Sequence, residues 1–403
     1  MHVVTGWSAL RVLRALRMRS YRGNSVWLPA VDLPERTAVI ARDGLELQAT
    51  KRISAKKAWQ PAVEHTVTLE ESGFAFEGVV ASKRVDFERF YDLGPFTVDD
   101  PLELGVFDPN KRVHLKTTKS RVLSRTLPQT ALLRVDPDLY IAGPEFIVAQ
   151  VAETATIIEL VQIIMELCGS YAVMPISTAE SLQMTVYEIP PVTSIVMIKE
   201  LLANARVRTR ARSLIKQAFA YAREGSASPA ETKLALMLGL PMELGGYGLG
   251  MPVPNARLEV PEGERAYVGQ DHYDLDLYWA DCRADIEYES TEFHLDPLLG
   301  VSLEGLRSDE VKAWREDCIA RGAHDRTRLR DIQALNVQVI PVVAADLSDV
   351  RSLDHVARAL LWRKAAANGF DDVAHLASFD DYDMRTARES LHAELFADAT
   401  CRY

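Results

Sequence analysis

Two neighbouring segments in the second half of the chain alternate acidic and apolar residues, and this pattern restricts the fold more than any other feature. Each segment places polar side chains on one side of an extended strand and apolar side chains on the other. The polar sides carry Asp274, Asp276 and Tyr278 in residues 273–279, and Asp285, Glu287 and Glu289 in residues 284–289. If the strands are antiparallel neighbours, Asp276 and Glu287 face each other across the pair.

These two strands belong to a longer order of predicted elements. A helix is expected to open at Ser228, which can cap it, with Pro229 at the first position and Glu231 at the third. The remaining elements are strands at 256–260, 272–279 and 284–289, a helix at about 308–335, a strand at 337–343 and a helix at 353–364. The order α-β-β-β-α-β predicts a mixed α/β layer arrangement, in which the long helix crosses over to a parallel neighbouring strand.

The first half of the chain has the pattern of a mixed α+β domain. Its predicted strands are at 37–40, 66–69, 74–80 and 113–115, and its predicted helices are at 7–18, 144–169, 194–204 and 206–223. The segment Gly225–Pro229 is rich in turn-forming residues and interrupts the helical pattern. We therefore expect two domains, at residues 1–225 and 226–403.

Composition excludes some classes of protein. The net charge of −11 argues against a uniformly cationic nucleic-acid binder, although it is compatible with local basic patches. The four cysteines form no CxxC pair, so we expect neither a zinc site nor a disulfide framework, and a cytoplasmic location fits best. No signal-peptide pattern opens the sequence. Charged residues and glutamines interrupt the most apolar stretch, 144–168, so we expect no membrane span.

Two carboxylates opposed on adjacent strands repel each other unless one is protonated, solvated or bound to a cation. Oxygen ligands of this kind suit Mg²⁺ or Mn²⁺, and such an ion can activate water for attack on a phosphodiester. His294 follows the second strand and is a candidate general acid/base or phosphate contact. The competing interpretation is simpler: a solvated strand face, a surface histidine, and a helix N-terminal acid at Glu231.

The second half resembles the endonuclease-like domain related to the very-short-patch-repair endonucleases, within the PD-(D/E)xK superfamily. The resemblance rests on the order and spacing of short segments between Ser226 and Asp346, and no single motif carries it. These segments are Ser228–Glu231, Met251–Asn255, Asp276–Trp279, Ile286–Ser290 with Phe293–His294, Asp325–Arg326 with Arg330, and Val337–Val343 with Asp346–Leu347. The resemblance implies a restriction-endonuclease-like αβββαβ domain that acts on DNA.

The resemblance also implies roles for particular residues. Asp276 and Glu287 would be the ligands of Mg²⁺ or Mn²⁺, and Glu231 would be the supporting acid on the helix. Glu289 would occupy the position that is lysine in the founding pattern of the superfamily. A lysine there orients the nucleophile and offsets phosphate charge, whereas a glutamate does neither, so catalytic competence is in question.

A positive group from elsewhere would have to replace that lysine. His294, Arg326 and Arg330 are the candidates that the sequence offers.

The first half shows a second resemblance. The segments Arg125–Pro128, Tyr140–Glu145 and Glu166–Tyr171 are similar to the region found in front of such nuclease-like domains. They also weakly resemble the regulator or antitoxin proteins of abortive-infection systems. Those proteins usually begin with a winged helix-turn-helix, which is not evident here, and this weighs against a DNA-binding regulator.

Basic residues gather in three islands of this acidic chain. They are Arg11, Arg14, Arg17, Arg19 and Arg22; Lys111, Arg112, Lys116, Lys119, Arg121 and Arg125; and Arg206, Arg208, Arg210, Arg212 and Lys216. Such islands either contact phosphates or form solvated faces. We expect nucleic-acid contacts from the third island and the long helix, at Arg206, Arg210, Lys216, Arg326 and Arg330. The glycine-rich loop 245–250 leads into no helix, so we interpret it as a connection and not as a phosphate loop.

Three functions stay open from the sequence. The first is a Mg²⁺-dependent nuclease that hydrolyses DNA phosphodiesters. The second is a catalytically degenerate nuclease fold that serves as a nucleic-acid-binding regulator or as an antitoxin-like module of a defence system. The third is a protein that binds a partner protein and has no nucleic-acid role.

Overall fold

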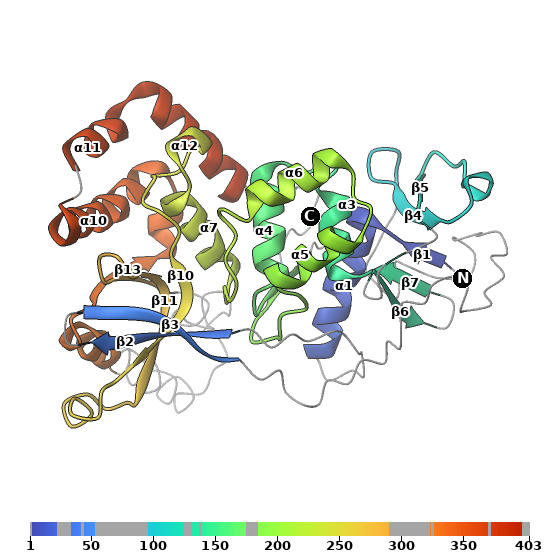
Figure 1. The fold of residues 1–403 in the computed structure, drawn as a ribbon. Helices are drawn as coiled ribbons and strands as arrows, with labels where there is room; N and C mark the ends of the chain where they lie inside the picture. The colour runs from blue at the N-terminus through green and yellow to red at the C-terminus, as the bar shows by residue number, and fades with distance from the viewer. Residues whose placement is uncertain are drawn as a thin grey trace, which may run out of the picture. The chain divides into compact units, whose positions relative to one another are not determined.

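The computed structural model describes residues 2–21, 34–41, 44–52, 96–124, 127, 131–136, 139–174, 184–289, 323, 326–369 and 372–396. The described residues form two compact units. One contains the chain up to Pro229 apart from Pro34–Arg52, and the other contains Pro34–Arg52 together with the residues from Ala230. Both units combine helices with mixed sheets (Figure 1), so the expected α/β class is confirmed at this coarse level.

The first unit contains a five-stranded sheet in the order β5-β4-β1-β7-β6 and a small β8-β9 pair. The strands are β1 (His2–Val4), β4 (Leu102–Val106), β5 (Thr118–Val122), β6 (Leu132–Asp136), β7 (Leu139–Ala142), β8 (Ala172–Met174) and β9 (Met184–Val186). The predicted strand at 113–115 is wrong. The chain turns there, with the Val113 amide 2.9 Å from Ser120 Oγ and the Thr118 amide 3.1 Å from the Leu115 carbonyl.

The helices of the first unit are α1 (Gly6–Tyr21), α3 (Pro144–Val151), α4 (Ile157–Leu167), α5 (Ile195–Asn204) and α6 (Thr209–Ala218). The single helix predicted over 144–169 is two helices. Thr156 Oγ1 accepts from the Glu159 amide at 3.0 Å, and Glu159 Oε2 accepts from the Thr156 amide at 2.8 Å. This capping box starts a new helix at Ile157, although the apolar pattern of the sequence continues without a break.

The second unit contains a six-stranded sheet in the order β13-β12-β11-β10-β2-β3. Its strands are β2 (Pro34–Ala41), β3 (Gly44–Arg52), β10 (Val253–Glu259), β11 (His272–Trp279), β12 (Ala284–Glu289) and β13 (Gln338–Val343). Its helices are α7 (Pro229–Gly239), a helix at 326–334, α10 (Val350–Asn368), α11 (Asp372–Asp380) and α12 (Tyr382–Phe396). Strands β12 and β13 are parallel, as the crossover predicted.

The hairpin β2–β3 corrects the expected division of the chain. A boundary between residues 225 and 226 assigned Pro34–Arg52 to the N-terminal domain. However, β2 pairs in parallel with β10, with Thr37 opposite Arg257 and Ala38 opposite Leu258. The edge of β10 offers unpaired backbone groups that any extended segment can satisfy, and local sequence does not say which segment does. The strands predicted at 66–69 and 74–80 lie outside the described residues.

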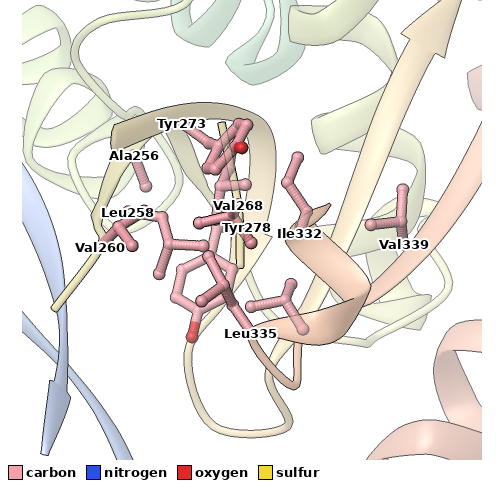
Figure 2. Packing of buried hydrophobic residues seen from close by; sticks show 11 residues of the cluster. Ala256, Leu258, Val260, Val268, Tyr273, Tyr278, Ile332, Leu335 and Val339 are labelled. Carbon is pink, nitrogen blue, oxygen red and sulfur yellow. The ribbon is translucent and has the colours of Figure 1, made fainter. Parts of the chain in front are cut away.

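A cluster of buried side chains joins β10 and β11 to the chain around the 326–334 helix. Figure 2 shows Ile332 and Leu335 gathered with Leu258 and Tyr278. Ile332 and Leu258 are fully buried, and Leu335 is 6% exposed. Burial of this apolar surface fixes the 326–334 helix against the strands that carry the acidic residues.

The glycine-rich loop after α7 is a packed connection, in agreement with its interpretation from the sequence. Gly245 and Gly248 have φ values of 84° and 69°, which only glycine adopts readily. Between them, the Tyr247 hydroxyl donates to Asp354 Oδ1 at 2.7 Å. Arg385 on α12 also binds Asp354, at 2.9 Å, so the loop is anchored to the C-terminal helices.

Candidate acidic site on the sheet of the second unit

Strands β11 and β12 place Asp276 opposite Glu287. The strands are antiparallel, with Leu277 opposite Ile286 and Tyr278 opposite Asp285, and the same register continued by one residue pairs the two acids. The Tyr288 amide donates to Asp276 Oδ2 at 2.9 Å, which fixes one oxygen of that carboxylate. The predicted juxtaposition of these acids on neighbouring strands is therefore confirmed.

The acids of β12 are not a solvated strand face. Asp285 is 0% exposed and Glu287 is 6% exposed, whereas Asp274 on β11 is exposed. Burial of an ionised carboxylate is costly unless a proton, a cation or hydrogen bonds compensate the charge. The simpler interpretation from the sequence is thus wrong for Asp285 and Glu287, and something must balance their charge.

Electrostatic strain is evident at Asp276. Its side chain keeps partial exposure, yet removal from water is the largest cause that raises its pKa well above the ordinary range. The negative charges of Glu287 and Glu231 raise this pKa further, and the hydrogen bond from Tyr288 opposes them. Three carboxylates therefore act on one another, which is an arrangement that a cation would relieve.

Asp285 is under the same electrostatic strain. Burial, followed by the neighbouring Glu287, raises the pKa of Asp285 well above its ordinary value. Its Oδ1 accepts from the Leu277 amide at 3.3 Å. Asp285 Oδ2 and Glu287 Oε1 are buried and find no donor among the described residues. Both oxygens therefore lie in a part of the site where the negative charge is incompletely compensated.

Arg328, on the 326–334 helix, provides the opposite charge. Its Nη1 donates to Glu287 Oε2, and its Nη2 donates to the backbone carbonyl of Asp274. Burial disfavours the charged guanidinium, but the hydrogen bond and charge of Glu287 raise the pKa of Arg328 above its ordinary value. Arg328 is therefore a permanent cation at the acidic cluster.

Sequence reasoning named Arg326 and Arg330 on this helix and missed Arg328. Arg326 and Arg330 are exposed, and Arg330 bonds to the Arg326 carbonyl and to Thr327 Oγ1, each at 3.2 Å. A signal was present in the sequence. Arg328 stands four residues before the apolar Ile332 and therefore shares its buried face, whereas Arg326 and Arg330 point elsewhere.

Glu231 is more than a helix-terminal acid. It lies in the first turn of α7 and is 7% exposed. Its Oε2 accepts from Asn255 Nδ2 at 3.1 Å, and its charge acts on Asp276. Asn255 lies on β10 with a positive φ of 47°. The hydrogen bond between Asn255 and Glu231 links α7 to the strand beside the acidic site. The sequence placed Asn255 in one of the matching segments but indicated no role for it.

Two of the expected site residues are less informative. Glu289 is the last residue of β12 and is partly buried, opposite Val343 of β13. His294 lies outside the described residues, so its proposed role as a general acid/base stays a prediction.

A cavity of about 350 Å³ adjoins the acidic cluster. Arg328 and Asp274 belong to its wall, and the hydrogen bond from Arg328 to Glu287 connects the cavity to the cluster. The other residues that line it are Gly269, Gln270, His272, Tyr273, Thr327 and Asp331. Tyr273 donates to Asp331 Oδ2 at 2.8 Å, which ties the helix to β11 along this wall.

Two arginines of the first basic island are internal. Arg14 and Arg17 on α1 are 3% and 2% exposed. Arg14 binds the carboxylate of Glu166, and Arg17 donates to the carbonyls of Glu166, Gly169 and Pro190. Arg11 pairs with Asp100 nearer the surface. Arg14 and Arg17 therefore form neither a phosphate-binding patch nor a solvated face, because their cations serve the core of the first unit.

The third island lies on the first unit, around α6. Arg206, Arg210 and Lys216 are exposed, as a nucleic-acid contact requires. Arg208 pairs with Glu153 at 3.2 Å, and Arg212 donates to the Ala205 carbonyl at 3.1 Å.

The second island contributes two further structural pairs. Lys119 binds Glu103 at 2.7 Å, and Arg121 binds Glu153 at 2.6 Å. Lys111, Arg112 and Lys116 are exposed.

No ready-made metal site is present in the described part of the chain, in the sense of three His, Cys, Asp or Glu side chains arranged around one point. No helix among the described residues is long and apolar enough to cross a membrane. Comparisons of the chain with protein-family models, with curated proteins and with solved structures gave no match. The resemblance to the PD-(D/E)xK superfamily accordingly stays a prediction.

Proposed function

We propose that the second unit is a restriction-endonuclease-like, metal-dependent nuclease that acts on DNA phosphodiesters. Asp276 and Glu287 would hold Mg²⁺ or Mn²⁺, with Glu231 as the supporting acid. The observation that carries this proposal is that Asp276 and Glu287 lie opposite each other on β11 and β12. A third acid, Glu231, is close enough for its charge to raise the pKa of Asp276.

The chemistry of the oxygen donors supports a hard divalent cation. Glu287 Oε1 is buried without a hydrogen-bond donor among the described residues, and Asp276 is under repulsion from two carboxylates. Carboxylate oxygens in a charge-rich cluster are ligands that Mg²⁺ and Mn²⁺ accept, with water and phosphate completing the shell. A bound ion would lower the pKa of water and stabilise the developing charge on phosphate.

The residues of the chain would divide the remaining work. The Tyr288 amide holds the carboxylate of Asp276 in place, and the burial of Asp285 beside Glu287 raises the pKa of Asp285 and so favours its neutral form. Arg328 supplies the cation that Glu289 cannot, from the helix and not from the strand. A guanidinium can bind phosphate through two hydrogen bonds, so Arg328 is the best-placed described group to contact the substrate.

The test is cleavage of plasmid DNA in the presence of Mg²⁺ or Mn²⁺. Wild-type protein should cut, and Asp276→Ala should lose about a hundredfold or more of the rate, as expected for removal of an electrostatic group at a reacting centre. Asp271→Ala is the matched control, because this acid lies just before β11, is exposed and pairs only with Arg265 among the described residues. Absence of metal binding and of cleavage in the wild type would sink the proposal.

A second candidate is a catalytically degenerate nuclease fold that binds nucleic acid as a regulator or as an antitoxin-like defence module. The observation that favours it is the Arg328–Glu287 ion pair, since a guanidinium already balances the charge that a metal would balance. The glutamate at position 289, where the founding pattern has lysine, also favours this candidate. Salt-dependent DNA binding that survives both Asp276→Ala and a chelator would support this candidate over the nuclease.

A further inference from the structure

We infer that Arg328 is a latch: it holds Glu287 until a phosphate group of a nucleic acid enters the adjoining cavity, and its transfer to that phosphate frees Glu287 to bind a divalent cation. The inference rests on the proposed function, since it concerns the same site. It adds a phosphate subsite and a coupling between phosphate binding and metal binding.

The closed state of the latch is visible in the contacts of Arg328. One guanidinium nitrogen of Arg328 donates to Glu287 Oε2 and another donates to the Asp274 carbonyl, so two hydrogen bonds fix the orientation of the guanidinium. The Glu287 side chain is 8% exposed, whereas the Arg328 side chain is 26% exposed. The acid is therefore buried under a cation that itself reaches solvent.

A divalent ion and the guanidinium compete for the same charge. Asp276 and Glu287 would hold the ion, and Arg328 already binds the carboxylate of Glu287, so two positive charges would share one acid and repel each other in a partly buried site. While Arg328 is bound to Glu287, one oxygen of this proposed ligand is occupied. The latch therefore lowers the affinity of the site for a divalent cation.

The cavity of about 350 Å³ offers the alternative partner for Arg328. Its wall carries hydrogen-bond donors from Gln270, His272, Thr327 and Arg328. A pocket with these donors fits a phosphate group with its attached sugar better than it fits a cation.

The two acids of the cavity are already engaged. Asp274 binds Arg257 at 3.0 Å, and Asp331 accepts from Tyr273 at 2.8 Å. Because the Tyr273–Asp331 bond anchors the helix, Arg328 can change partner by rotating its side chain while the backbone stays in place.

Coupling of this kind is reciprocal. If phosphate in the cavity increases metal affinity, metal must increase the affinity for phosphate by the same factor. The protein would then bind metal weakly until nucleic acid arrives, so that the hydrolytic centre assembles only on its substrate.

The experiment measures Mn²⁺ affinity by isothermal titration calorimetry, with and without a short phosphorothioate DNA duplex. For the wild-type chain, DNA should tighten Mn²⁺ binding about tenfold, within the usual range of coupling energies. In Arg328→Gln, Mn²⁺ should bind about tenfold more tightly without DNA, and DNA should add little further, because the latch is already open. Arg358→Gln is the control: this exposed arginine on α10 pairs with Asp380 and has no part in the proposed site, so the variant should behave as the wild type does.

The outcomes separate this inference from the proposed function. Mn²⁺ binding by Arg328→Gln that equals or falls below that of the wild type overturns the latch. If binding is coupled as expected but the wild type cuts no DNA, the latch stands and the nuclease proposal fails. If neither protein binds Mn²⁺, both fail.

A second variant covers the case in which Arg328→Gln does not fold, as judged by circular dichroism. Arg328→Lys keeps the charge but replaces the two-point fork with a single ammonium. Its Mn²⁺ affinity should lie between those of the wild type and the open state, and an affinity identical to that of the wild type counts against the latch.

Discussion

Arg14 Nε lies 2.9 Å from Oε1 and 3.2 Å from Oε2 of Glu166, and both side chains are almost fully buried. This ion pair joins α1 to the end of α4, across 152 positions of the chain. Arg17 lies one turn further along α1, where burial, only partly offset by Glu166, lowers its pKa to about 10. Arg14 and Arg17, which in the sequence look like part of a phosphate-binding patch, are therefore internal scaffolding of the first unit.

Arg14→Met should destabilise the protein by roughly 3–5 kcal/mol, because it leaves the charge of Glu166 buried without its cation. Urea unfolding monitored by circular dichroism measures the loss. Arg11→Met is the control: Arg11 pairs with the half-exposed Asp100, so we expect a loss below about 1 kcal/mol. Arg14→Met/Glu166→Met should recover much of the stability. Equal losses from the two single variants would contradict the scaffold role.

Asp285→Asn should stabilise the fold at neutral pH. The folded-state pKa of Asp285 is raised, first by burial and then by Glu287, so folding favours the protonated acid. Such a group contributes its full stability below its unfolded pKa of about 3.9 and loses this contribution as pH rises towards the folded pKa. Asparagine keeps a neutral donor at all pH values. The free energy of unfolding of the variant, measured across pH, should therefore increase relative to that of the wild type as pH rises. Parallel pH profiles of the two proteins would refute this account.

Gly246→Ala should destabilise the second unit by roughly 1–3 kcal/mol, the usual cost of overpacking. A Cβ at this position would lie 2.1 Å from the backbone oxygen of Leu240, which cannot move without disturbing the end of α7. Gly263→Ala is the control, because a Cβ there meets no heavy atom of the described chain within 4 Å. The midpoints of thermal unfolding compare the two variants, and the loop would not be a packed connection if both melt alike.

A fragment of residues 230–397 should be unstable by itself, because β10 would lose its pairing with β2. A synthetic peptide of residues 34–52 supplied in trans should raise its Tm, since ligands that bind only the folded state stabilise it by mass action. A peptide with proline in place of Ala38 should fail to do so, because proline interrupts the pairing of a central strand. Full stability of the fragment without any peptide would speak against the shared sheet.

Local periodicity carried most of what the sequence could predict. The predicted limits of β11 and β12 match the structure because polar and apolar residues alternate there with a period of two, and this alternation also placed Asp276 opposite Glu287. The parallel pairing of β12 with β13 followed from the intervening helix.

Other features depend on partners that periodicity does not reveal. The role of Arg328 required the docking of a helix on the sheet, and the burial of Arg14 required a partner in α4. The break before Ile157 depended on the competition of Thr156 with the helix backbone. In each case a tertiary contact, or a side chain that competes with the backbone, determined the outcome.

The membership of β2–β3 in the sheet of the second unit also affects how the protein is made and how it can evolve. The ribosome releases this hairpin long before β10, with most of the first unit synthesised in between. Completion of the second sheet must therefore wait until β10 to β13 have been synthesised. A genetic exchange that moves only the segment after Pro229 would leave two strands behind, so the second unit cannot pass between genes as one uninterrupted cassette.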